Sequence, residues 1–271
     1  MTKRSLMAVT AIFLTATGAQ AQQTMQWKQV LNVQKHLNQP QGVSIDILGI
    51  EPGDTYEDAK AKLEKIAAEP GSQEISPVRE TKNIFRLQTP GGFLTAEYVG
   101  SMQMERRLPE HPRVQEGIRI LFSAPSSGHQ VLGVVRNLTY YEQNEQPRVS
   151  ETLARLSEKL KAQPQQFDTT FRYQFDNGRA FATPGANILS CKINMSANSP
   201  DAARNANNTG VCDIILDVGV EFGISKDHAK SLRFTLSDNE RARQNVSADF
   251  KYFSEYARGV QTQSQGTAPK L

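Results

Sequence analysis

The sequence predicts an α+β protein: a tandem duplication of a helix-plus-antiparallel-sheet unit, followed by an extra C-terminal helix. Residues 44–70 read as an apolar strand, a Pro-Gly turn, a helix and a proline, and residues 138–164 repeat this order about 95 residues later. Residues 117–140 and 212–237 share a strand–turn–strand pattern at a similar interval. Because predicted strands outnumber helices, we expect one helix across one face of each unit's sheet.

These patterns divide the chain into five segments. Residues 1–21 are a leader, and residues 22–41 are a lead-in that is either a short helix or extended. Residues 42–137 form the first unit, and residues 138–258 form the second unit with the C-terminal helix. The polar residues 259–271 are expected to be a disordered tail.

The leader has the features of a secretory signal peptide. Lys3 and Arg4 precede an apolar run, and Ala19, Gln20 and Ala21 fit a small-residue cleavage site. The run is too short to anchor the chain in a bilayer. We therefore expect a protein of the periplasm or a secreted protein, with no membrane span. Cleavage removes one Lys and one Arg from a chain of net charge +3, and the nearly neutral remainder favours no nucleic-acid partner.

Capping residues mark where the helices are expected to begin. Asp54 or Thr55 can cap the first helix, with Asp58 at capping-box spacing from Thr55. Ser150 is the expected cap of the second helix. Apolar residues at helical spacing give each helix one buried face.

The C-terminal helix and the strands follow similar signals. Ser237 with Glu240 is expected to cap the C-terminal helix, which should end near Gly259. Aromatic residues at positions 171, 173 and 175 alternate with polar ones, which favours a core strand over a ligand platform. Asn177-Gly178 then indicates a tight hairpin.

The sequence contains no recognisable catalytic, cofactor or metal motif. Four histidines are too widely spaced to suggest a ligand set: His36, His111, His129 and His228. Residues 126–129, Ser-Ser-Gly-His, place hydroxyls beside an imidazole, but we interpret them as a solvated turn. We therefore expect neither a metal nor a cofactor, and an enzyme is the least favoured class of function.

The two cysteines, Cys191 and Cys212, are expected to form a disulfide between neighbouring antiparallel strands. In an oxidising compartment an even pair without nearby histidines favours a disulfide over a metal site.

The polar insert between the cysteines is the candidate partner-binding loop. It lacks aromatic and large aliphatic residues and must therefore lie on the surface. Its candidate contact residues are Ser196, Asn198, Asp201, Arg204 and Asn207. The alternative is a tolerated insertion that binds nothing. The scarcity of Trp, Tyr and Arg, the usual anchor residues of interfaces, favours this alternative.

Residues 53–59, Gly-Asp-Thr-Tyr-Glu-Asp-Ala, with Leu63 and Pro70, resemble the helix start of small envelope proteins of the SmpA/OmlA type. Here Asp54 stands where that family has a methionine, and the Leu-Gly pair and the lipid-bearing cysteine are absent. Two such units with a disulfide also resemble the tandem-repeat β-lactamase inhibitor proteins, and periplasmic proteins of proteobacteria with a C-terminal cysteine pair. These resemblances imply a binding or assembly role.

Three classes of function stay open. The first is a non-enzymatic protein-interaction module of envelope-assembly or inhibitor type, whose partner is another envelope or secreted protein. The second is a carrier of a small apolar ligand, and the third an enzyme of unidentified class. The partner's identity and the oligomeric state do not follow from the sequence.

The disulfide gives a direct prediction. Cys212→Ser should lower the melting temperature in non-reducing buffer, because closing the loop with a disulfide stabilises the fold by about 3 kcal/mol on the chain-entropy model. Differential scanning calorimetry with and without reductant measures it. An unchanged melting temperature would show that the bridge is absent or without consequence.

Overall fold

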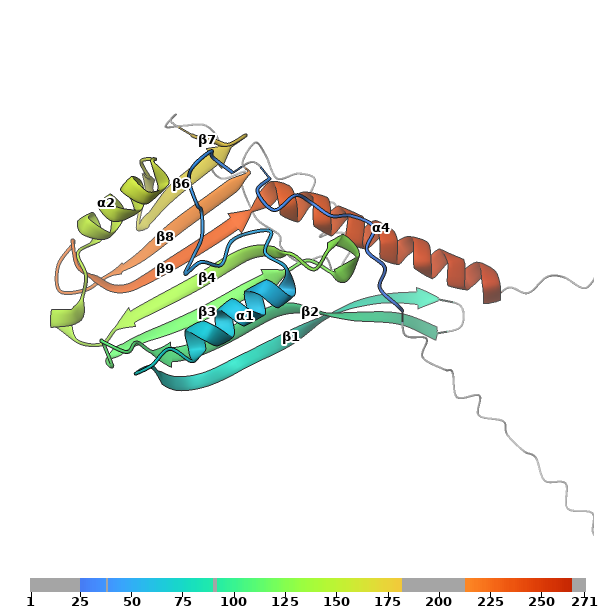
Figure 1. Cartoon of the computed structure of the whole chain (residues 1–271), viewed down its shortest axis with the longest axis horizontal. Coiled ribbons are helices and arrows are strands. Elements are labelled where there is room, and N and C mark those ends of the chain that lie inside the picture. Colours follow the sequence, from blue (N-terminus) through green and yellow to red (C-terminus); the bar gives the residue numbers. More distant parts are fainter. Residues whose placement is uncertain (1–24, 38, 90–91, 182–212, 265–271) are drawn as a thin grey trace, which may run out of the picture.

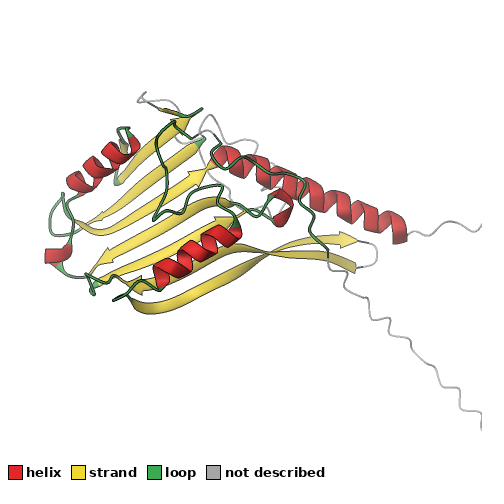
Figure 2. Cartoon of the chain, viewed as in Figure 1, coloured by secondary structure: helices red, strands yellow, loops and turns green. Residues whose placement is uncertain are grey.

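The computed structural model describes residues 25–37, 39–89, 92–181 and 213–264. Figure 2 shows helices set beside long antiparallel hairpins. In chain order the elements are α1 (Tyr56–Ala67), β1 (Gln73–Thr89), β2 (Gly92–Arg107), β3 (Val114–Phe122), η1 (Pro125–Ser127), β4 (Val131–Tyr140), η2 (Gln143–Glu145), α2 (Val149–Leu160), β5 (Gln165–Phe167), β6 (Thr170–Asp176), β7 (Arg179–Ala180), β8 (Ile214–Phe222), β9 (Ala229–Asp238) and α4 (Asn239–Ser264). Within these ranges, no helix combines the length and apolar character that a bilayer span requires.

The strands of the described residues form one nine-stranded antiparallel sheet, so the α+β class with a C-terminal helix is confirmed (Figure 1). The order is β1-β2-β3-β4-β9-β8-β6-β5, with β7 paired to β6. β4 and β9 are neighbours at the centre, paired from Gly133–Ser237 to Thr139–Ser231. The two predicted units therefore share one sheet, and the expected boundary after residue 137 lies inside β4.

The two halves of the sheet have similar local geometry. α1 and α2 both span 12 residues, β3 and β8 both span 9, and β4 and β9 both span 10. The β3–β4 and β8–β9 ladders each shift register at the last pair, beside Phe122 and Phe222. Each helix begins at a bridge to the turn before the last strand of its half, Thr55–Gln130 and Arg148–His228.

α1 and α2 lie on the same face of the sheet, which is therefore the core face (Figure 1). Ala59 and Leu63 of α1 are completely buried there, as the helical spacing predicted. Val149 and Leu160 of α2 join the same apolar cluster. The expected aromatic strand is also confirmed as core, since Tyr173 of β6 is completely buried.

The helix caps agree with the sequence at α1 and differ at α2. Thr55 caps α1, because its hydroxyl accepts a hydrogen bond from the Asp58 backbone N–H at 3.2 Å. Ser150 was expected to cap α2, which is wrong, since it lies inside the helix. Asp227 caps that helix from the turn before β9, accepting from the Ser150 backbone N–H and hydroxyl, each at 2.9 Å.

α4 also begins and ends differently from the prediction. Asp238 caps the helix, because its carboxylate accepts from the Arg241 backbone N–H at 2.9 Å. The predicted cap Ser237 is instead buried in β9. The helix continues past Gly259 to Ser264, so the first residues of the predicted disordered tail are helical.

The predicted apolar strand at residues 44–50 is also wrong. The segment forms a tight turn closed by a single bridge between Ile47 and Ile50, with positive φ at Leu48 and Gly49. Ile45, Ile47 and Ile50 are buried in the core cluster. Their apolar side chains therefore serve to cover the sheet, and the backbone does not extend it.

The described part of the lead-in is not helical; it lies along α4 and the β1–β2 hairpin (Figure 1). Trp27 packs against Phe85, Tyr98 and Tyr252, and its indole N–H donates to the Glu97 carbonyl at 2.9 Å. These aromatic side chains belong to a second apolar cluster beside α4. The lead-in thus closes the junction between the hairpin and α4.

A completely buried guanidinium, that of Arg241, joins the lead-in to α4. Arg241 donates to the carbonyls of Gln34 at 2.8 Å and Lys35 at 2.7 Å, and to the Gln130 side chain at 3.1 Å. Its Nε also lies 3.1 Å from the carboxylate of Asp238. One side chain therefore satisfies acceptors from three separate parts of the chain.

Removing this guanidinium should destabilise the fold strongly. Arg241→Met leaves Asp238 buried without its cation, and we expect the free energy of unfolding to fall by about 3–5 kcal/mol in urea titrations. Lys251→Met, at an exposed position of the same helix, is the matched control and should change it by less than about 0.5 kcal/mol. Equal effects of the two variants would contradict the role given to Arg241.

Candidate functional site

The sheet has a second face, opposite α1 and α2, which we call the open face. Alternation along each strand creates it, because side chains flanking a buried residue point to the other side. In β3, Ile118 and Ile120 are buried and Arg119 between them is exposed. In β9, Leu232 is buried and its neighbour Arg233 is exposed. The same pattern that builds the core therefore places polar groups on this face.

Strand register arranges the open-face residues in two ranks that cross the sheet. The first rank, from β2 to β6, is Gln103, Arg119, Val135, Thr235, Asp217 and Arg172. The second rank is Glu105, Gly117, Asn137, Arg233, Gly219 and Thr170. Both ranks run through the β4–β9 pair, so the face draws on both halves of the sheet.

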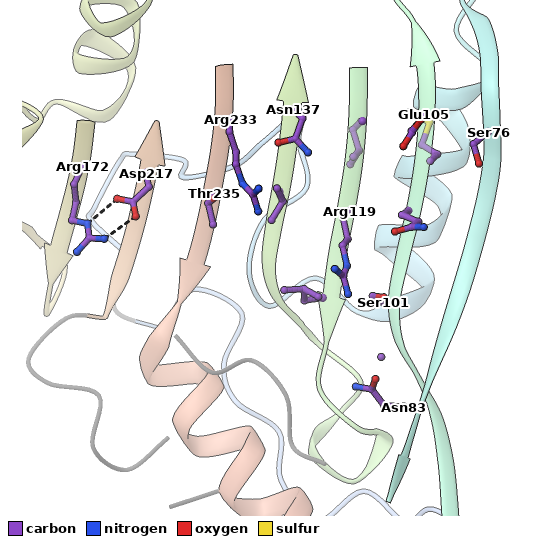
Figure 3. A pocket seen from close by; sticks show the side chains of 17 residues that line it. Ser76, Asn83, Ser101, Glu105, Arg119, Asn137, Arg172, Asp217, Arg233 and Thr235 are labelled. Atoms are coloured by element: carbon purple, nitrogen blue, oxygen red, sulfur yellow. Dashed lines mark hydrogen bonds and ion pairs between the residues drawn. The ribbon is translucent and has the colours of Figure 1, made fainter. Parts of the chain in front are cut away.

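A hollow of about 660 Å³ lies on this face, and Figure 3 shows the side chains around it. Residues of both ranks line it, from Glu105 on β2 to Arg172 on β6. Gly117 contributes no side chain to its floor. Three arginines, Asp217 and Glu105 line it together with the apolar side chains of Met104, Ile118, Leu121 and Val135. This charged lining distinguishes it from the mostly apolar pockets typical of carriers of small hydrophobic ligands.

The three arginines of the hollow differ in their partners. Arg172 forms a two-point ion pair with Asp217, with Nε–Oδ1 2.7 Å and Nη2–Oδ2 2.8 Å (Figure 3). Arg119 and Arg233 are exposed, and neither makes a hydrogen bond or ion pair with any described residue. Because Asp217 is paired with Arg172, the described residues leave the donors of the other two guanidinium groups available to a ligand.

The neutral residues between these two arginines can add hydrogen bonds. Asn137 pairs with Arg233 across the β4–β9 ladder, and Thr235 pairs with Val135, the neighbour of Arg119. An amide and a hydroxyl can each donate and accept. The arrangement suits a polar or negatively charged surface that lies across several strands.

The serine and histidine of residues 126–129 do not form a catalytic pair. Ser126 is completely buried in η1 and donates to the Asp249 carboxylate at 2.5 Å. His129 instead stacks on Tyr56 with ring centroids 4.6 Å apart, and its Nε2 lies 2.8 Å from the Val99 carbonyl. Burial lowers the pKa of His129. The expected solvated turn is thus a buried helical turn that packs against α4.

None of the site residues predicted from the sequence belongs to the open face as the structure describes it. Cys191, Cys212 and the insert with Ser196, Asn198, Asp201, Arg204 and Asn207 lie outside the described residues. Among the described residues, no group of three or more His, Cys, Asp or Glu side chains could hold a metal ion. The histidines lie apart, with His228 Nδ1 2.7 Å from the Ser225 hydroxyl in the turn before β9.

Sequence reasoning missed the open face. Its signal is present, because Arg119, Arg172 and Arg233 each lie between two apolar residues of a predicted strand. That pattern places each arginine opposite the core. It does not show that the three strands belong to one sheet.

Searches of protein-family models, curated proteins and solved structures found no match to this chain.

One titratable group has an unusual environment where α4 packs against η1. Asp249 of α4 is completely buried and accepts from the Ala124 backbone N–H at 2.8 Å and from Ser126. Burial raises the pKa of Asp249 to about 7, and these hydrogen bonds oppose the rise only in part. The unfolded chain should titrate this group at its ordinary pKa of about 4.

Folding should therefore take up a proton at Asp249 between about pH 4 and pH 7. The contribution of the protonated Asp249 side chain to the free energy of unfolding is fully present below the unfolded pKa and is lost as the pH rises through 7. Relative to Asp249→Asn, the free energy of unfolding should be roughly 2 kcal/mol greater at pH 5 than at pH 8. Urea titrations of both proteins at the two pH values measure it, and parallel pH profiles would refute the assignment.

Proposed function

We propose that the protein is a non-enzymatic binding module of the periplasm or of the secreted fraction, and that the open face receives a protein partner. The observation that carries this proposal is a pair of exposed arginines on the open face, Arg119 and Arg233, that make no hydrogen bond or ion pair within the described part of the chain. Arginine is enriched in protein interfaces and is a frequent energetic anchor there. The leader-like residues 1–21 support the location.

The two halves of the chain are a duplicated unit in this proposal. Equal element lengths, the register shifts beside Phe122 and Phe222, and the bridges at both helix starts support it. Arg136 and Phe234 are the sixth residues of β4 and β9, and these equivalent positions pair with each other at the centre of the ladder, as a two-fold relation between the halves requires. Duplication explains how a wide sheet arises from a small unit, and the wide sheet provides the area that a protein partner needs.

The resemblances found in the sequence favour the same class of function. SmpA/OmlA-type proteins and tandem-repeat inhibitor proteins imply binding or assembly, and the polar open face is consistent with that role. An apolar-ligand carrier has less support, because Arg119, Arg233 and Glu105 line the hollow. An enzyme has less support as well, because Ser126 and His129 turn to different partners.

In-cell crosslinking tests the proposal. A photoreactive residue at Gln103, an exposed open-face position, should capture a partner protein. The double variant Arg119→Gln with Arg233→Gln should reduce the yield of crosslinked partner at least about fivefold, because desolvated interface arginines contribute about 1–2 kcal/mol. Mass spectrometry identifies the partner and quantifies the yield.

The matched control removes two positive charges elsewhere. Arg155 and Lys226 are exposed and make no described ion pair, and Arg155→Gln with Lys226→Gln should keep the full yield. Circular dichroism should show the same melting temperature for both double variants. A yield that the open-face variant leaves unchanged, or no captured protein, would refute the proposal.

A further inference from the structure

We infer that the open face recognises an acidic segment of its protein partner, whose carboxylates bind Arg119 and Arg233 together. This inference rests on the proposed function and names the chemistry of the partner. It starts from the side chains of the hollow, where three arginines meet two carboxylates. Once Arg172 is paired with Asp217, the described lining of the hollow retains two arginines and one carboxylate, that of Glu105.

Glu105 does not neutralise either free arginine. Its carboxylate accepts a hydrogen bond from the Gln115 side chain at 3.2 Å, on the edge of the face toward β2. The whole chain is close to electrically balanced, with 31 basic and 28 acidic residues. The excess of positive charge at the hollow is therefore local, and it complements a locally acidic ligand.

The positions of the arginines indicate a ligand that extends across strands. Arg119 lies on β3 and Arg233 on β9, with β4 between them and a two-residue step along the strands. At the usual strand spacings their Cα atoms lie about 12 Å apart. Two carboxylates on one polypeptide segment can each pair with one of these arginines. They therefore fit this spacing better than a single carboxylate does.

The residues between the arginines favour a polypeptide over other polyanions. Asn137 and Thr235 offer both donors and acceptors, which match the amide groups of a peptide backbone. A polyphosphate has acceptors but almost no donors, and would leave the acceptors of this face without partners. The described ranks also contain no aromatic side chain on which a nucleic-acid base could stack.

Fluorescence anisotropy with a labelled peptide tests the inference. We expect the full chain to bind an alternating Glu-Ser peptide of about ten residues, long enough to cross the sheet at the usual strand rise. Binding should weaken with added salt, because exposed charges are screened. The matched Gln-Ser peptide should bind at least about tenfold more weakly, a change of roughly 1.4 kcal/mol.

Arginine variants assign the binding to the open face. Arg119→Gln with Arg233→Gln should weaken Glu-Ser binding at least about tenfold, and Arg155→Gln with Lys226→Gln should leave it unchanged. No binding of the acidic peptide, or equal binding by both double variants, would overturn the inference. Tighter arginine-dependent binding of inorganic polyphosphate than of the peptide would also overturn it, in favour of a non-protein polyanion.

The two proposals can fail separately. If crosslinking to a protein depends on Arg119 and Arg233 while the acidic peptide does not bind, the proposed function stands and the acidic class is wrong. If the peptide binds but the crosslinks do not depend on the arginines, the face binds acids in vitro and the proposed protein-binding function is wrong.

Discussion

The antiparallel pairing of β4 with β9 is the constraint on which the rest of the molecule depends. It joins a four-stranded half, β1 to β4, and a five-stranded half, β5 to β9, into one sheet and fixes which side chains face α1 and α2. Because side chains alternate along a strand, a slip of one residue would turn Leu138 outward and Asn137 into the core. The buried neighbours of these strands oppose that slip, since each apolar side chain turned outward would lose about 1.5–3 kcal/mol of burial. The open face and the core are thus set by the same ladder.

Local patterns predicted much of the fold because their causes are local. The α1 cap, its buried face, and the Asn177-Gly178 hairpin depend on residues within a few positions of one another. Asn177 and Gly178 both have positive φ, as such a tight turn requires. These features follow from spacing and backbone sterics alone.

The predictions that failed depended on distant residues. Ser150 has the chemistry of a cap, but Asp227 reaches the helix end from the turn before β9. Residues 44–50 have the composition of a strand, but their isoleucines are buried against the sheet in a turn. In each case a tertiary contact outweighed a local preference, and the neighbouring residues in the sequence do not predict that contact.

The candidate site required the strand order, which the sequence did not provide. The outward direction of Arg119 and Arg233 could be predicted from alternation, but their neighbourhood depends on β4 lying next to β9. The ion pair that occupies Asp217 depends on the β6–β8 register. Without these pairings the arginines are separate surface residues, and a polar insert appears the better candidate.

The position of Trp27 has an optical consequence. It is the single tryptophan of the chain, and it lies where the lead-in meets the β1–β2 hairpin and α4. Its emission therefore reports the environment of this junction. A red shift in the emission spectrum would mark detachment of the lead-in, and comparison with far-ultraviolet dichroism would show whether the junction and the sheet come apart in one step.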